Sequence, residues 1–234
     1  MTSRSPAAEQ SELERRFRVV ETTIKLGVPP RDVSILHPAS AEDLIDEEEF
    51  DTDERLPYWA ELWPSARVLG ERLLATKGAG IRLLELGCGS GLVSACAAMA
   101  GYDVCASDYY DDALRFSRVN AWRNADRDIR TKLLDWRRLP ARLPRYDAVV
   151  ASDVLYERPY GALVAQVLAA TIAPDGWAIV ADPGRVGRDD FIATLAASGL
   201  TLARHEMVPY AEGKIRQRIT LYHVTNATSG VSIP

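Results

Sequence analysis

A glycine-rich turn follows the first strongly apolar segment of the central sequence. Residues 81–86 (IRLLEL) are typical of a buried strand, and the chain then passes through Gly87, Cys88, Gly89 and Gly91 into a helical segment. Glycines remove the Cβ atoms that would hold a ligand away from the backbone, and a helix N-terminus supplies N–H donors and partial positive charge. The turn therefore predicts a site for a ligand with an anionic or polar group.

An acidic residue, Glu85, lies two residues before the first glycine of that turn. Its presence distinguishes this motif from the motif of dinucleotide-binding proteins. The glycines follow the pattern G-x-G-x-G, whereas dinucleotide sites follow G-x-G-x-x-G. A carboxylate in the same crevice favours a cationic ligand over a pyrophosphate. The alternative is that the glycines serve only the tight passage from strand to helix.

Two further acids each close a strand-like segment, at the end where open α/β sheets bind ligands. The carboxylate of Asp108 can accept hydrogen bonds from both hydroxyls of a ribose; its alternative role is to cap the helix that starts at Tyr109. Asp135 precedes Trp136, so an acid can accept from an adenine amino group while the indole covers the ring. A capping aspartate beside a half-buried tryptophan is the alternative there.

These residues need a parallel sheet to bring them together. From residue 81 onward, strands expected at 81–86, 102–107, 129–134, 146–152 and 177–181 alternate with helices expected near 91–100, 110–124, 160–171 and 188–198. Parallel strands need crossover connections, so this alternation predicts a doubly wound α/β sheet with helices on both faces. Two last strands, 200–209 and 216–224, flank a turn with Gly213 and predict a C-terminal antiparallel hairpin that completes seven strands.

In these features the sequence resembles the class I S-adenosyl-L-methionine (AdoMet)-dependent methyltransferases, whose seven-stranded Rossmann-like sheet also ends in an antiparallel hairpin. The resemblance covers about residues 55–224. It implies AdoMet as cofactor, with Glu85, Gly87 and Gly89 along its methionine part and Asp108 on its ribose. The other cofactor-binding residues that it implies are Trp63, Cys88, Gly91, Asp135, Trp136 and Ser152.

Three further segments suggest the kind of acceptor. Residues 57–64 read PYWAELWP, residues 152–157 read SDVLYE after the fourth strand, and residues 182–185 read DPGR after the fifth. Together they look like the protein-lysine methyltransferases related to human family 16, above all those that methylate the β subunit of electron transfer flavoprotein. The asparagine-proline-proline-aromatic motif of amino-methylating nucleic-acid enzymes is absent from residues 152–155, which disfavours adenine or glutamine as acceptor.

This resemblance implies transfer of a methyl group to a lysine side chain of a protein, with the electron transfer flavoprotein β subunit as partner. An in-line displacement at a sulfonium carbon needs an aligned neutral amine, although a lysine has an ordinary pKa of about 10.4. Asp153 and Glu157 would attract and orient that amine. The rings of Trp59, Trp63 and Tyr156 would enclose its alkyl stem. The implied catalytic residues are Asp153, Tyr156 and Glu157, and the implied substrate-binding residues are Trp59, Glu61 and Arg185, with Trp63 beside them.

Several alternatives stand beside this interpretation. Asp153 could cap the next helix, Tyr156 could belong to the core, and one tryptophan of residues 57–64 could be a hydrophobic staple onto the sheet. A small-molecule N-methyltransferase is the first rival function, favoured if residues 9–54 close the pocket. The second rival is a non-catalytic AdoMet-binding interaction module.

The residues before 55 form a predicted N-terminal appendage. Residues 9–26 place apolar side chains at helical spacing and predict an amphipathic helix, and residues 33–36 predict a short strand. Nine of the thirteen residues of 42–54 are acidic, which is typical of a solvated surface, with a docking site for a basic partner as the alternative. We expect this appendage (1–54) to serve substrate recognition more than the fold of the methyltransferase domain (55–225), which a tail (226–234) follows.

Composition and charge argue against several other classes of protein. With 234 residues, 47% hydrophobic and 26% charged, the chain has the size and balance of one globular domain. No apolar run approaches a membrane span and the first ten residues are polar, which predicts a cytoplasmic protein without a membrane partner. The net charge of −5 disfavours nucleic acid as the main partner. Three cysteines without a C-x-x-C pair are expected to be reduced core thiols, three scattered histidines predict no metal site, and no G-x-S-x-G motif suggests a hydrolase.

Overall fold

The computed structural model describes residues 4–41, 44 and 57–226. Apart from Leu44, the acidic segment 42–54 lies outside the described residues, as do the predicted domain boundary at 54/55 and residues 227–234 of the tail. The predicted division into appendage, domain and tail therefore stays a prediction.

Seven strands form the main sheet, and they are β3 (Arg82–Leu86), β4 (Asp103–Asp108), β5 (Arg130–Leu133), β6 (Tyr146–Ser152), β7 (Ile172–Asp182), β8 (Leu200–Glu212) and β9 (Ile215–Asn226). Their order in the sheet is β5-β4-β3-β6-β7-β9-β8. Neighbours are parallel from β5 to β7, whereas β9 is antiparallel to both β7 and β8. The predicted fold, a doubly wound and mostly parallel sheet of seven strands with a C-terminal antiparallel hairpin, is confirmed.

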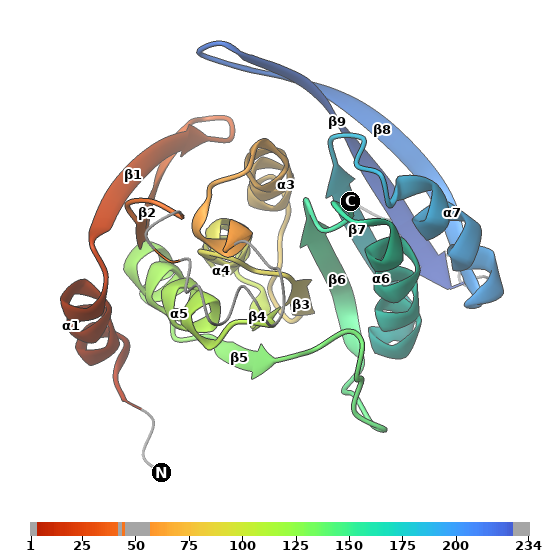
Figure 1. The fold of residues 1–234 in the computed structure, drawn as a ribbon, viewed down its shortest axis with the longest axis horizontal. Coiled ribbons are helices and arrows are strands. Elements are labelled where there is room, and N and C mark those ends of the chain that lie inside the picture. The colour runs from red at the N-terminus through yellow and green to blue at the C-terminus, as the bar shows by residue number, and fades with distance from the viewer. Residues whose placement is uncertain (1–3, 42–43, 45–56, 227–234) are drawn as a thin grey trace.

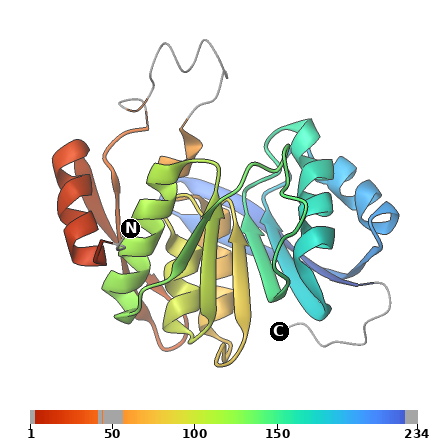
Figure 2. The same cartoon turned by 90° about the horizontal axis from the view of Figure 1, so that it is seen from below.

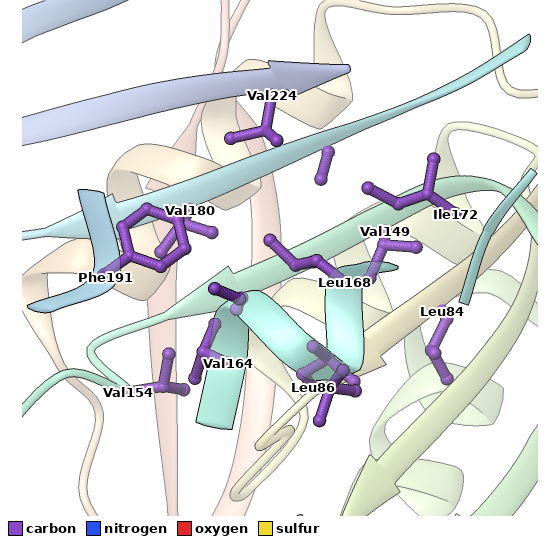
Figure 3. Close-up of a cluster of buried hydrophobic side chains, with 14 of the residues drawn as sticks. Leu84, Leu86, Val149, Val154, Val164, Leu168, Ile172, Val180, Phe191 and Val224 are labelled. Carbon is purple, nitrogen blue, oxygen red and sulfur yellow. The ribbon is translucent and has the colours of Figure 1, made fainter. Parts of the chain in front are cut away.

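Helices cover both faces of this sheet (Figures 1 and 2). One face packs against α3 (Pro64–Leu74), α4 (Leu92–Met99) and α5 (Asp111–Ala125), and the other packs against α6 (Arg158–Thr171) and α7 (Arg188–Ala197). Figure 3 shows the second face, where Val149 and Val180 of the sheet meet Val164 and Leu168 of α6 and Phe191 of α7. Because both faces are buried, the central strands are mainly apolar, and Glu85 in β3 and Asp108 in β4 are buried polar exceptions.

The N-terminal region differs from its prediction. Residues 9–26 were expected to be one helix, but α1 (Pro6–Arg16) ends at Arg16, and β1 (Val19–Leu26) pairs antiparallel with β2 (Arg31–Pro38). The prediction of a helix beyond Arg16 is wrong, because Val, Thr and Ile in β1 lose side-chain freedom in a helix and fit a strand. The short strand expected at 33–36 is present and longer than expected.

This N-terminal region shares hydrophobic clusters with the methyltransferase body. Leu13 of α1 is fully buried beside Phe116 of α5, and Ile35 of β2 is fully buried in a cluster with Leu92 and Cys96 of α4. Figure 1 shows α1 beside α5. Residues 6–38 therefore pack into the body of the fold, while the expectation that the N-terminal region serves substrate recognition more than the fold stays a prediction.

A buried asparagine joins β2 to the glycine turn. The side chain of Asn120 in α5 accepts a hydrogen bond from the Leu36 N–H (2.8 Å) and donates to the carbonyl oxygens of Leu36 (2.7 Å) and Ser90 (2.8 Å). One amide thus satisfies backbone groups of a distant hairpin and of the turn after β3.

The thiols of Cys88, Cys96 and Cys105 are free and buried, as predicted. Among the described residues, no group of His, Cys, Asp or Glu could hold a metal ion. The same described part of the chain contains no helix that is long and apolar enough to cross a membrane.

Candidate active site

The glycine turn occupies the carboxyl end of β3, at the centre of the sheet. Gly87, Gly89 and Gly91 all have left-handed backbone conformations, with φ of +67°, +51° and +85°. A Cβ on Gly91 would lie 2.3 Å from the Cα of Ser117, and one on Gly89 would lie 2.9 Å from the carbonyl oxygen of Trp59. Gly91 is thus required for the close packing of α4 on α5. The alternative that the glycines serve the backbone, and not a ligand, therefore explains part of this turn.

Asp108 ties the end of β4 to this turn. One carboxylate oxygen accepts the N–H of Gly89 (2.9 Å), and the other accepts the N–H of Tyr110 (3.1 Å). Burial raises the pKa of Asp108, and these backbone hydrogen bonds oppose that rise. The N-cap of α5 is Tyr110, so Asp108 does not cap this helix. The backbone of Tyr109 makes a further hydrogen bond to this carboxylate. The two oxygens together have about four acceptor positions, so some capacity remains for a ligand.

Glu85 is the deepest acid of the site. It is 1% exposed, it lines the pocket, and its carboxylate accepts a hydrogen bond from the hydroxyl of Ser94 in α4. Its pKa is raised to about 8, mainly by burial and also by the neighbouring charge of Asp108, while the hydrogen bond from Ser94 opposes the rise. At neutral pH Glu85 is therefore mainly protonated in this structure, and a nearby cation would favour its charged form.

The loop after β5 carries Asp135 and Trp136. The guanidinium of Arg137 donates to both carboxylate oxygens of Asp135 (2.9 and 3.0 Å), and its Cζ lies 5.2 Å from the ring centroid of Tyr109. The Trp136 Nε1–H is buried and has no hydrogen-bond partner among the described residues. Asp135 therefore already has a cationic partner, whereas Trp136 has an unused donor.

Five aromatic rings form a continuous wall along the pocket. The ring centroids of Trp63 and Tyr58 lie 6.1 Å apart, those of Tyr58 and Tyr156 5.4 Å, those of Tyr156 and Tyr160 5.0 Å, and those of Tyr160 and Trp136 5.9 Å. All five residues line the pocket. Burial raises the pKa of Tyr156 far above its ordinary value, so its phenol stays neutral. We call these five residues the aromatic wall.

Asp153 does not cap the helix that follows it. Its backbone is left-handed (φ +57°), and its carboxylate accepts from the Ser65 hydroxyl (3.0 Å) and from Nε of Arg185 (2.6 Å). α6 instead begins at Arg158, with Glu157 as its N-cap residue. The Cζ of Arg185 also lies 5.3 Å from the ring centroid of Trp63. The charge of Asp153 is thus compensated within the protein.

A single pocket gathers the predicted site. Apart from Arg185, every predicted site residue lines it, namely Trp59, Glu61, Trp63, Glu85, Gly87, Cys88, Gly89, Gly91, Asp108, Asp135, Trp136, Ser152, Asp153, Tyr156 and Glu157. This arrangement agrees with the predicted grouping, while the role of each residue stays a prediction.

Sequence reasoning missed several lining residues, including Tyr58, Tyr109, Tyr110, Arg137 and Tyr160. Two of them carried a usable signal. Tyr58 lies within the aromatic segment 57–64, and Tyr160 follows Tyr156 at a spacing that often brings side chains together.

Residues 58–223 match the family model described as a methyltransferase domain. The chain belongs to this family. The match confirms the predicted class, the class I AdoMet-dependent methyltransferases, and with it the predicted cofactor, AdoMet.

Two curated relatives are ubiquinone biosynthesis O-methyltransferases. The enzyme of Leptothrix cholodnii is 24% identical over 119 residues, which cover 50% of this chain and 51% of the relative. The enzyme of Bordetella pertussis is 28% identical over 124 residues, which cover 50% and 49%. This chain therefore spans about half the length of the curated relatives that it matches.

Solved structures show the same fold. Magnesium protoporphyrin IX methyltransferase from Synechocystis PCC 6803, with bound AdoMet, has a TM-score of 0.55 at 20% identity, over 79% of this chain and 94% of that one. The ribosomal protein L11 methylase from Lactobacillus delbrueckii subsp. bulgaricus has a TM-score of 0.52 at 19% identity, over 69% and 77%.

Proposed function

We propose that this chain is an AdoMet-dependent methyltransferase that methylates a small-molecule amine. The observation that carries the acceptor class is the pairing of Asp153 with Arg185 and Ser65 beside an aromatic wall. The family match supports the methyltransferase activity, and the AdoMet bound to the magnesium protoporphyrin IX methyltransferase supports the methyl donor.

Bound AdoMet would supply an electrophilic methyl group on a sulfonium ion. The free acceptor positions of Asp108 suit the ribose hydroxyls, and the left-handed Gly87 and Gly89 let a ligand approach the backbone beside Glu85. The face of Trp136 suits an adenine ring. Its unused Nε1–H is the polar group available on that side, whereas the carboxylate of Asp135 is paired with Arg137.

The charge distribution favours a small acceptor over a lysine of a protein. Asp153 was expected to attract the lysine ammonium, but Arg185 already compensates that charge. The remaining acids on the acceptor side, Glu61 and Glu157, are exposed and line the same pocket as the aromatic wall. Aromatic faces with nearby carboxylates suit a compact amine that enters as a cation.

Transfer requires that the amine lose its proton before its nitrogen lone pair attacks the methyl carbon and the carbon–sulfur bond breaks. Glu157 is exposed at the start of α6, so a proton passed to its carboxylate can leave to water. The neutral Tyr156 phenol lines the same pocket and adds no charge there. The relatives named for ubiquinone biosynthesis and for magnesium protoporphyrin IX also support a small acceptor.

A protein lysine is the second candidate acceptor, with the electron transfer flavoprotein β subunit as the substrate that the sequence motifs suggest. The exposure of Glu61 and Glu157 favours it, because a long side chain from another protein could reach them from solvent. The likeness to a ribosomal protein methylase shows that this fold also serves protein substrates.

The test is methyl transfer from labelled AdoMet into an extract of cells that lack this protein, separated by size after the reaction. We expect the label in the small-molecule fraction, and we expect it to disappear with the Asp108→Ala variant. Purified electron transfer flavoprotein is assayed in parallel by intact mass. Label confined to a protein band would replace the proposal with the second candidate, and AdoMet binding without any transfer would leave a non-catalytic binding module.

A further inference from the structure

We propose that Arg185 is a positioning residue, which fixes the acceptor side of the pocket from outside it. Arg185 does not itself line the pocket, yet its guanidinium contacts both Trp63 and Asp153, which do. The inference rests on the proposed function, because it assigns the acceptor to the part of the aromatic wall formed by Trp63, Tyr58 and Tyr156.

The guanidinium makes two different contacts at once. Its Nε donates to the Asp153 carboxylate at 2.6 Å, and its Cζ lies 5.3 Å from the centroid of the Trp63 ring. A planar, delocalised cation can pair with a carboxylate and stack on an aromatic face at the same time, whereas an ammonium group is a point charge. Arginine is therefore the residue type that holds both partners in one geometry.

The backbone of Arg185 is itself held in place. Asp182, at the end of β7, is fully buried, and its carboxylate accepts the N–H groups of Gly184 (2.7 Å) and Arg185 (3.1 Å). Gly184 has a left-handed backbone (φ +97°), which permits this tight turn. The backbone of Arg185 is thus fixed close to the end of β7. This end lies beside the end of β6, which Asp153 follows directly.

The contact with Trp63 extends to the rest of the aromatic wall. The Trp63 Nε1–H donates to the Tyr58 carbonyl oxygen (3.0 Å), and the ring of Tyr58 packs edge to face against Tyr156. Trp63 is also the N-cap residue of α3. Fixing its indole therefore orders η2 (Tyr58–Ala60), the start of α3 and the ring of Tyr156 together.

The contact with Asp153 stabilises a strained position. A non-glycine residue at φ +57° is held only where its surroundings determine its conformation, and here the partners of its carboxylate are Arg185 and Ser65. The Asp153 side chain is 3% exposed, so loss of the guanidinium would leave a buried charge without its cation. We expect the residues after β6, including Tyr156, to shift as a result.

The experiment compares Arg185→Met with Arg185→Lys, and uses Arg158→Met, an exposed arginine at the start of α6, as the matched control. Acrylamide quenching of tryptophan fluorescence is measured for each variant, alone and in a Trp63→Phe background. We expect Arg185→Met to increase quenching, with no increase in the Trp63→Phe background. Arg185→Lys should give a smaller increase, because it keeps the charge and loses the planar stack.

Calorimetric titration with S-adenosylhomocysteine reports the cofactor side independently of any acceptor. We expect Arg185→Met to keep this affinity within about twofold, while the KM for the acceptor found by labelling rises about tenfold. Quenching that is unchanged, or that rises equally without Trp63, would overturn the proposal. So would a parallel loss of S-adenosylhomocysteine affinity. The fluorescence result needs no acceptor, so it stands even if the proposed amine substrate is wrong.

Discussion

The carboxylate of Asp108, at the end of β4, accepts the N–H of Gly89, in the turn after β3, at 2.9 Å. We propose that the same carboxylate accepts from the ribose of the cofactor, so Asp108→Ala should remove ligand contacts and loosen the turn. We expect the affinity for S-adenosylhomocysteine to fall at least about tenfold, since hydrogen bonds to a charged group contribute about 1.5–3 kcal/mol. Calorimetric titration measures this, with the exposed Asp111→Ala as control. Unchanged affinity would exclude Asp108 from the cofactor site.

Gly91 and Gly80 provide a matched pair for the packing of the glycine turn. Both have a left-handed backbone, but a Cβ on Gly91 would lie 2.3 Å from the Ser117 Cα, whereas one on Gly80 would meet nothing within 4 Å. We expect Gly80→Ala to cost about 1 kcal/mol, from backbone strain alone. Gly91→Ala should cost about 3 kcal/mol or more, because α4 and α5 must move apart. Urea unfolding compares the two, and equal losses would contradict the packing role of Gly91.

Glu85 should make stability fall with rising pH. Its pKa in the folded chain is about 8, raised by burial from an ordinary 4.5, so folding favours the protonated form. The resulting stabilisation is complete below pH 4.5 and is lost as pH rises through 8, by an amount on the order of 5 kcal/mol. Glu85→Gln should flatten this dependence in urea unfolding between pH 5 and 9, whereas the exposed Glu14→Gln should not. An unaltered slope in Glu85→Gln would show that Glu85 is charged throughout.

His223 should act in the opposite direction. It is fully buried on β9, neither ring nitrogen has a hydrogen-bond partner among the described residues, and burial followed by the charges of Arg204 and Arg72 lowers its pKa to about 4. The unfolded chain takes up this proton near pH 6.5, so stability is lost as pH falls from 6.5 to about 4, by about 3 kcal/mol. Thermal melting of His223→Phe should lack this loss. The exposed His205→Phe should retain it.

Asn120 and Asn124 test how strongly the N-terminal hairpin is tied to the body. Asn120 is fully buried, with three backbone partners on Leu36 and Ser90, while Asn124 makes the corresponding pair of hydrogen bonds to Ser34 in a partly exposed position. We expect Asn120→Ala to cost about 2–4 kcal/mol, because buried backbone groups lose their partners, and Asn124→Ala clearly less. Urea unfolding measures both. Equal small losses would mean that the hairpin is only loosely attached.

The sequence was sufficient to predict the main sheet, since apolar strands and helices alternate strictly from residue 81 onward. It was also sufficient to predict that most of the site residues lie close together, because residues that follow parallel strands meet at one edge of the sheet. The N-terminal error has a specific cause. Leu13, Phe17, Val20 and Ile24 fit a helical spacing, but the β-branched residues of β1 and its antiparallel pairing with β2 favour a strand.

Side-chain partners were beyond prediction. Asp153 and Arg185 follow different strands and form an ion pair. Their positions in the sequence do not predict this pair, because the guanidinium could equally point to solvent or to a substrate. The same holds for Asp135, whose partner Arg137 is two residues away. Such choices depend on rotamers and on the burial of each partner, which local sequence does not determine.

The hydrogen bonds of Asn120 to Leu36 join residues that lie 84 positions apart in the chain. During synthesis, β2 leaves the ribosome before α4 and α5, so the cluster of Ile35 still lacks Leu92 and Cys96, and the cluster of Leu36 still lacks Phe116, until those helices are made. A nascent chain in that state exposes an incompletely covered hairpin, which is a target for chaperones. Docking of the hairpin on α5 therefore makes the completion of the glycine turn a late event in folding, after the helix that follows β4 has emerged.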